Sequence, residues 1–147
     1  GNAKVANHFA RLLDVPVAAG SKRRLADDKV IIDEIVGDVA GKDIIVLDDE
    51  IATAGSIVEL LDKIREIGVS SISVACTHGL FTGNAVERLN AQADVGEYVS
   101  TNTGPAPQGL AKHEIRSVAP LFAEAVRRIN RGESVADLFS AERTYGK

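Results

Sequence analysis

Short apolar runs alternate along this chain with segments whose apolar residues recur at helical spacing. Residues 44–47 are four consecutive apolar residues, a run typical of a buried strand. From Ile57 to Ile67 the apolar residues lie three or four positions apart, which predicts an amphipathic helix. The stretch 20–28 is polar and basic, so a loop is predicted there. The same reasoning predicts helices over 2–13, 83–90, 134–139 and from about Pro120 to Ile129, and strands over 15–19, 30–36, 71–77, 95–100 and 113–118.

This alternation indicates an α/β fold, with a mostly parallel sheet flanked by helices that cover both of its faces. Ligands of such sheets bind beyond the carboxyl ends of the strands. If the strands are parallel, the loops after residues 20, 48 and 77 open on one edge of the sheet. The pattern therefore predicts where a binding site would lie.

Composition limits the possible classes of protein. With 147 residues, 45% of them hydrophobic, the chain is long enough for one globular domain, residues 1–147. A net charge of −4 gives no support to nucleic-acid binding, and no apolar run is long enough to cross a membrane. The single Cys76 lies in an apolar run, which favours a buried thiol and fits a cytoplasmic protein. No His, Asp and Cys cluster has metal-ligand spacing.

The segment 44–56 carries the most informative chemistry. Two carboxylates, Asp48 and Asp49, follow the apolar run, and carboxylates beyond a strand end can accept hydrogen bonds from sugar hydroxyls. The predicted helix begins near Gly55, so the loop amides can converge on an anion such as phosphate. Acids at strand ends and helix-capping hydroxyls are also common in α/β proteins without a ligand, and that alternative stays open. We expect a ribose 5-phosphate site formed by Asp48, Asp49, Thr53, Ala54, Gly55 and Ser56.

A basic triplet, Lys22-Arg23-Arg24, lies in the predicted loop 20–28. Taken alone, the triplet is typical of a solvated surface turn. Cations are nevertheless what phosphoryl or pyrophosphoryl transfer requires, because negative charge spreads over the phosphate oxygens in the transition state.

The residues Asp48 to Ser56 resemble the phosphoribosyl-binding signature of type I phosphoribosyltransferase folds, above all that of the ribose-phosphate pyrophosphokinases. That family shows Asp-Asp, two variable residues, Asp-Thr, a small residue, Gly, and Thr or Ser. Here Ala52 replaces the third acid and Glu50 is an additional one. Residues 76–85 are similar to the family's Thr-His-Gly stretch, 100–103 to its Thr-Asn segment, and 132–139 to its Ser-Val-x-x-Leu-Phe ending.

The resemblance implies transfer of pyrophosphate from ATP to ribose 5-phosphate, giving 5-phosphoribosyl 1-pyrophosphate and AMP. It implies that Lys22 and Arg24 act on the transferring group and that Mg²⁺ arrives with ATP. It also implies a homo-oligomer. Full family members have two related domains, so we expect the chain to be the carboxyl-terminal part of a longer protein and inactive alone. We further expect His78 to fix a loop through hydrogen bonds, rather than to act as a base or ligand.

Two alternatives remain. A nucleobase phosphoribosyltransferase shares the Asp-Asp loop, although the basic triplet and the Ser-Val-x-x-Leu-Phe ending suit the pyrophosphokinase better. A non-catalytic regulatory subunit associated with the synthetase is of a different class. The retained Lys22 and Arg24 argue against it, and Ala52 argues weakly for it.

Overall fold

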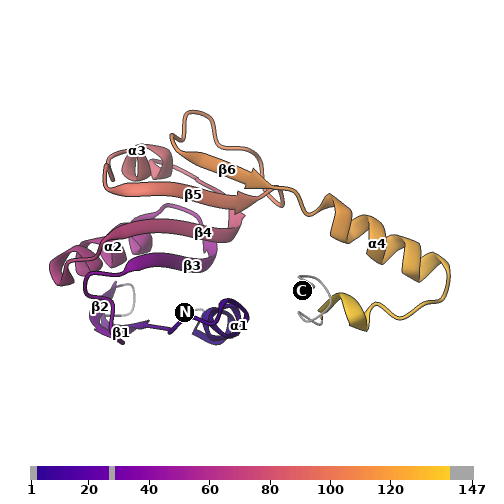
Figure 1. Ribbon diagram of the computed structural model, residues 1–147. Helices are drawn as coiled ribbons and strands as arrows, with labels where there is room; N and C mark the ends of the chain where they lie inside the picture. The colour runs from indigo at the N-terminus through magenta and orange to yellow at the C-terminus, as the bar shows by residue number, and fades with distance from the viewer. Residues whose placement is uncertain (1–2, 27–28, 140–147) are drawn as a thin grey trace. The chain divides into compact units, whose positions relative to one another are not determined.

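The computed structural model describes residues 3–26 and 29–139 (Figure 1). The chain forms two compact units, residues 1–116 and 117–147, which are described separately. The larger unit contains a parallel sheet of four strands in the order β3-β4-β5-β6. Helix α2 connects β3 to β4, and α3 connects β4 to β5, so the predicted α/β fold with a parallel sheet is confirmed. These elements are β3 (Asp43–Ile51), α2 (Gly55–Ile67), β4 (Ser71–Gly79), α3 (Ala85–Asn90), β5 (Val95–Thr101) and β6 (His113–Arg116).

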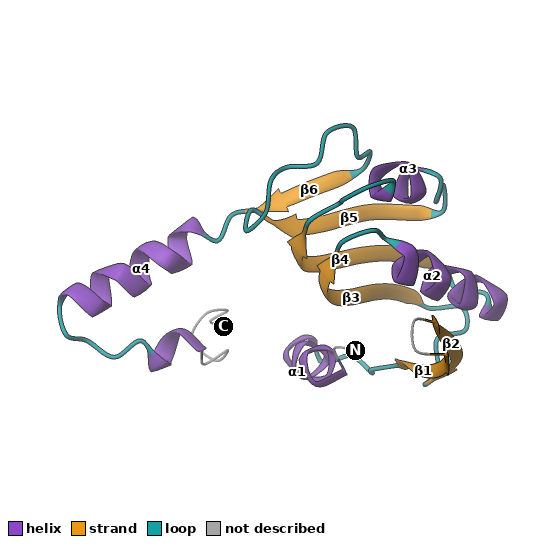
Figure 2. Ribbon diagram, turned by 180° about the vertical axis from the view of Figure 1, so that it is seen from behind, coloured by secondary structure: helices purple, strands orange, loops and turns teal. Residues whose placement is uncertain are grey.

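Helices α2 and α3 pack on the same face of this sheet (Figure 2). Both connections step in the same direction along the sheet, and right-handed crossovers then place their helices on one face. The core lies in this layer and includes the fully buried Leu61, Leu89 and Val95. On the opposite face Ile45 is 64% exposed. Within the described residues of 3–116, helices α2 and α3 thus cover one face of the sheet, and the expectation that helices cover both faces is only partly met.

The chain begins with helix α1 (Ala3–Leu13), as predicted, and continues into a two-stranded antiparallel hairpin of β1 (Ala19–Ala26) and β2 (Lys29–Val36). The predicted strand at 15–19 is wrong, because β1 starts only at Ala19. The predicted loop over 20–28 is also wrong as far as Ala26, and residues 27–28 lie outside the described part. Pairing with β2 satisfies the backbone groups of β1 whatever its side chains are, so a polar sequence can form this strand.

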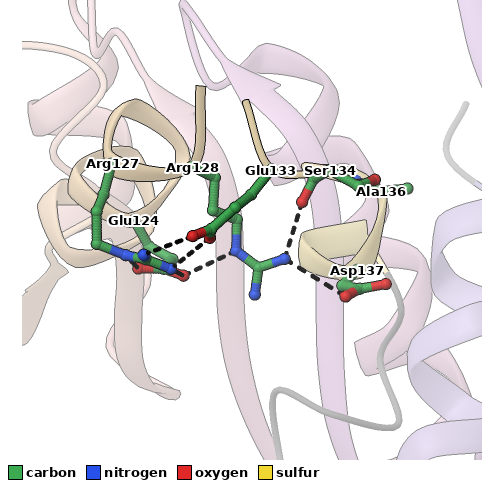
Figure 3. A network of polar contacts seen from close by, with 7 residues as sticks. All are labelled: Glu124, Arg127, Arg128, Glu133, Ser134, Ala136 and Asp137. Atoms are coloured by element: carbon green, nitrogen blue, oxygen red, sulfur yellow. Dashed lines mark hydrogen bonds and ion pairs between the residues drawn. The ribbon is translucent and has the colours of Figure 1, made fainter. Parts of the chain in front are cut away.

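The smaller unit contains helix α4 (Ala119–Asn130) and the 3-10 helix η1 (Ala136–Phe139), close to the bounds predicted from the sequence. Charged side chains join the two (Figure 3). Glu124 accepts hydrogen bonds from Arg127 and Arg128, each at 2.7 Å, and Arg128 Nη1 lies 3.4 Å from Asp137. The bonds from Arg127, and secondly from Arg128, lower the pKa of Glu124 to about 2. This network ties the end of α4 to the turn that follows it. None of the described helices is long and apolar enough to cross a membrane.

Candidate functional site

Strand β3 carries the two acids of the candidate site within its last residues. It continues past Leu47 to Ile51, and Asp48 pairs with Cys76 of β4 in the parallel register. The expectation that Asp48 and Asp49 lie beyond the strand end is therefore wrong. Ladder hydrogen bonds involve only backbone groups, so polar side chains do not end the strand.

The turn after β3 brings the backbone to the start of α2. The helix begins at Gly55, as predicted from the sequence, and Ala54 precedes it in the left-handed conformation with φ of 61°. The first amides of a helix have no acceptor inside the helix, and Ala54, the residue at the N-cap of α2, provides no side-chain cap. The N-cap position is thus occupied by an alanine rather than by a Thr or Ser hydroxyl. The helix dipole makes such uncapped amides favourable for an anion.

A cavity of about 430 Å³ lies at this turn. Its lining combines the acids at the end of β3 with the backbone of the turn and of the first residues of α2. The structure thus brings all six predicted binding residues together, although their role in binding stays a prediction. The cavity is lined by Asp48, Asp49, Glu50, Ala52, Thr53, Ala54, Gly55, Ser56 and Ile57.

The acids in this cavity are held by local hydrogen bonds. The Asp49 amide donates to Asp48 Oδ1 at 3.0 Å, and the Glu50 amide donates to Asp49 Oδ1 at 3.1 Å. The pKa of Asp49 lies below its ordinary value, first because of a hydrogen bond with the Asp48 side chain and second because of backbone N–H groups. An ionised carboxylate accepts hydrogen bonds only, which suits the recognition of hydroxyl groups.

The segment that follows β4 holds the turn from one side. Two consecutive carbonyls, those of Ile51 and Ala52, accept hydrogen bonds from it. The amides of Leu80 and Phe81 both donate to the Ile51 oxygen at 3.0 Å, and the Thr82 amide donates to the Ala52 oxygen at 2.9 Å.

The third carbonyl of the turn, that of Thr53, accepts a hydrogen bond from a side chain. Arg88 of α3 donates from Nη1 to this oxygen at 2.9 Å. Sequence reasoning missed Arg88, which lies 35 positions from Thr53 in the chain. A single arginine on a short helix gives no pattern that would have found it.

Hydroxyl groups at the ends of β4 and β5 form a second polar cluster. His78 Nδ1 lies 2.8 Å from Thr103 Oγ1, and the Thr101 hydroxyl donates to the Thr77 carbonyl oxygen at 2.7 Å. Thr103 also donates to the Thr77 carbonyl oxygen, at 3.1 Å. The expected hydrogen bond between His78 and a loop is therefore confirmed, whereas the exclusion of a role as base or ligand stays a prediction. These contacts join the segment after β5 to the carboxyl edge of the sheet.

Two other sequence predictions have different outcomes. Cys76 is buried as predicted, and burial first, then the charge of Asp48, raises the pKa of its thiol to about 11. Such a thiol is a poor nucleophile at neutral pH. Lys22 and Arg24 lie in β1, opposite Ile32 and Val30 of β2, but their side chains are outside the described part of the structure. Their catalytic role stays a prediction.

Comparison with known proteins identifies the family. The family model described as "Phosphoribosyl synthetase-associated domain" matches residues 6–140. The chain belongs to this family.

Relatives of this phosphoribosyl synthetase-associated domain cover nearly all of the chain. A Streptomyces coelicolor protein, whose ribose-phosphate pyrophosphokinase name is provisional, is 57% identical over 143 residues, which are 96% of this chain and 45% of that protein. The ribose-phosphate pyrophosphokinase of Deinococcus radiodurans is 42% identical over 145 residues, 95% of this chain and 45% of the relative. The chain thus spans slightly less than half the length of these relatives. That it forms their carboxyl-terminal part stays a prediction.

A solved structure supports the fold of the phosphoribosyl synthetase-associated domain. The crystal structure of phosphoribosylpyrophosphate synthetase from Mycobacterium smegmatis superposes with a TM-score of 0.77 at 32% identity, over 88% of this chain and 42% of that one. The resemblance to the ribose-phosphate pyrophosphokinases inferred from Asp48 to Ser56 is therefore confirmed.

Proposed function

We propose that the complete protein containing this chain transfers the pyrophosphoryl group of ATP to the 1-hydroxyl of ribose 5-phosphate, giving 5-phosphoribosyl 1-pyrophosphate and AMP. The observation that supports this most is the cavity at the turn from β3 to α2. It combines ionisable carboxylates with uncapped helix amides, and a sugar phosphate needs both an anion site and hydroxyl acceptors. The names of the relatives point to the same reaction.

Each part of the cavity has a role in this proposal. The amides of Thr53 to Ser56 bind the 5-phosphate, where the helix dipole favours negative charge. Asp48 and Asp49 accept hydrogen bonds from the ribose hydroxyls. The sugar is thereby held in one orientation.

In the proposed reaction, the 1-hydroxyl oxygen of the sugar attacks the β-phosphorus of ATP and releases its proton to solvent. The bond from that phosphorus to the bridging oxygen of the α-phosphate breaks, and this oxygen leaves with AMP. Lys22 and Arg24 would stabilise the charge that develops on the transferring group. Fixing the sugar in line with the β-phosphorus supplies much of the remaining rate enhancement. No side chain of the chain is required as a nucleophile.

We propose that magnesium enters this site together with the nucleotide. Among the described residues, no group of three or more His, Cys, Asp or Glu could hold a metal ion by itself. Mg²⁺ is commonly bound through one or two carboxylates and the phosphates of its substrate. Asp48 and Asp49 could supply such carboxylate oxygens, and the bound ion would neutralise phosphate charge. We also propose that the complete protein is a cytoplasmic homo-oligomer.

The test is to purify the complete protein and to measure AMP and 5-phosphoribosyl 1-pyrophosphate formed from ATP, Mg²⁺ and ribose 5-phosphate. We expect robust turnover from the complete protein and none from the 147-residue chain alone. Asp48→Asn should mainly raise the KM for ribose 5-phosphate, because Asp48 contacts the ground-state sugar. Lys22→Ala should instead lower kcat, on the order of 10²–10³-fold, because it meets charge only in the transition state.

The alternatives give different results in the same assay. A nucleobase phosphoribosyltransferase would consume 5-phosphoribosyl 1-pyrophosphate when a nucleobase is added, and would form no AMP from ATP. A regulatory subunit would form no AMP by itself and would change the rate of an added synthetase. A normal kcat in the Lys22→Ala enzyme would contradict the proposed role of Lys22 in catalysis. The basic triplet would then be interpreted as a solvated surface feature.

A further inference from the structure

We infer that Arg88 is a positioning residue for the phosphate-binding turn, an inference that rests on the proposed function of that turn. Arg88 is not among the residues that line the 430 Å³ cavity. Its Nη1 donates a hydrogen bond of 2.9 Å to the Thr53 carbonyl oxygen, from the side of α3. It therefore contacts the outside of the turn rather than the space a ligand would occupy.

The planarity of the peptide bond connects this contact to the ligand. The described peptide bonds are all trans, and in a trans peptide the N–H points opposite to the C=O. Holding the Thr53 carbonyl toward Arg88 thus directs the Ala54 amide away from Arg88. Backbone hydrogen bonds act in the same way on the two preceding peptides, because the carbonyls of Ile51 and Ala52 accept from the amides of the segment after β4. Arg88 donates from its side chain, whereas the other donors are backbone amides. Its hydrogen bond is therefore the one that a substitution can remove.

The backbone of Arg88 is itself held by hydrogen bonds. Its amide donates to the Asn84 carbonyl oxygen at 3.0 Å, and its own carbonyl accepts a bond of 2.8 Å from Gln92 Nε2. The neighbouring Leu89 is fully buried in the core. An exposed arginine on a mobile helix would gain little from one bond, but here the helix is anchored. The guanidinium is thereby held beside the turn.

The guanidinium also brings a permanent positive charge to the turn. An ideal Cβ built on Gly55 would lie 3.7 Å from Arg88 Nη1, so the charge is next to the first residue of α2. An arginine is always charged, and its planar head offers five N–H donors in a fixed geometry. The same group thus orients the turn and adds to the positive potential that the helix dipole already provides for an anion.

The test compares the affinity of the chain for ribose 5-phosphate and for ribose by calorimetry, in the wild type and in Arg88→Met and Arg88→Lys. Methionine keeps most of the side-chain length but neither donates nor carries charge. We expect Arg88→Met to weaken ribose 5-phosphate binding roughly tenfold, the loss expected for one hydrogen bond from a charged donor. Arg88→Lys should recover part of the affinity. Arg11→Met, at an exposed arginine near the end of α1, is the matched control and should bind as the wild type does.

Kinetics of the complete protein separates positioning from a general loss of structure. Arg88→Met should raise the KM for ribose 5-phosphate while kcat and the KM for ATP change less than twofold. Unchanged affinity in Arg88→Met, or an equal loss of affinity for ribose and ribose 5-phosphate, would overturn the inference. If Arg88→Met does not fold, Arg88→Lys provides the test. Wild-type affinity for ribose 5-phosphate in Arg88→Lys would then overturn the inference. A complete protein that makes no AMP contradicts the proposed reaction, whereas the binding comparison still tests Arg88.

Discussion

The phosphate-binding role of the turn can be tested at Gly55, the first residue of α2. An ideal Cβ there would lie 3.7 Å from Arg88 Nη1 and 3.9 Å from Thr53 Oγ1, both ordinary contacts. The φ of Gly55 is outside the left-handed region, so a side chain is compatible with the backbone. The two methyl groups of a valine extend about 1.5 Å further than its Cβ and would crowd the turn. We therefore expect Gly55→Val to keep the fold but to disturb the amides.

The size of the effect follows from the bond that is lost. A hydrogen bond to a charged group contributes about 1.5–3 kcal/mol, and each 1.4 kcal/mol corresponds to about a tenfold change in Kd. Displacing one amide from the phosphate should thus weaken ribose 5-phosphate binding roughly ten- to hundredfold. Calorimetric titration of the 147-residue chain measures this directly, and urea denaturation of the same samples reports any change in stability.

The matched control is Gly96→Val in β5. Gly96 is exposed and remote in sequence from the turn, and an ideal Cβ there would meet only the Ile72 oxygen at 3.5 Å. We expect this variant to bind ribose 5-phosphate as the wild type does. If Gly55→Val also binds within twofold of the wild type, the uncapped amides do not bind the phosphate, and the reasoning from the turn geometry is refuted.

Two further predictions concern stability. Tyr98 is 3% exposed, and its hydroxyl donates to the Leu89 carbonyl oxygen at 2.8 Å. That oxygen also accepts from the Gln92 amide at 3.0 Å, so Tyr98→Phe removes one of its two hydrogen bonds and should lower the free energy of unfolding in urea by about 0.5–1.5 kcal/mol. An unchanged denaturation midpoint would contradict this. Burial lowers the pKa of His113 below its ordinary 6.5, so the unfolded chain binds the proton more readily and stability should fall as the pH drops below about 6.5. His113→Gln should flatten this dependence, and a pH profile identical to that of the wild type would argue against it.

The sequence predicts those elements of the fold that bury one face. The spacing of Ile57, Leu61 and Ile64 reproduces the buried side of α2, and the apolar runs of β4 and β5 mark strands in the layer against it. Each of these elements owes its stability to apolar contacts, which leave a periodic trace in the sequence.

Other elements could not be predicted because backbone pairing determines them. The hairpin strand β1 contains three consecutive basic residues, and the sequence reasoning took them for a loop. The last residues of β3 are acidic, yet they continue the ladder with β4 as far as Ile51. Parallel or antiparallel pairing supplies partners for the backbone wherever a neighbouring strand is present, and a partner strand is not visible in the local sequence.

The candidate site was predictable where its residues are contiguous. Asp48 to Ser56 form one cavity because a strand, a tight turn and a helix follow one another directly. The contact between Arg88 and Thr53 joins α3 to the turn across 35 positions, and only the folded chain reveals it. Long-range side-chain contacts of this kind depend on how the crossovers pack, which the hydrophobic pattern does not encode.

The left-handed residue of the turn, Ala54, has a consequence for how the site responds to change elsewhere. Glycine would adopt φ of 61° without strain, but Ala54 is only 4% exposed and belongs to the core cluster with Ile57 and Leu61. The apolar packing that stabilises the domain therefore also sets the shape of the turn. Substitutions deep in the core, far from any substrate, should alter ligand affinity, and the turn should melt together with the domain rather than loosen before it.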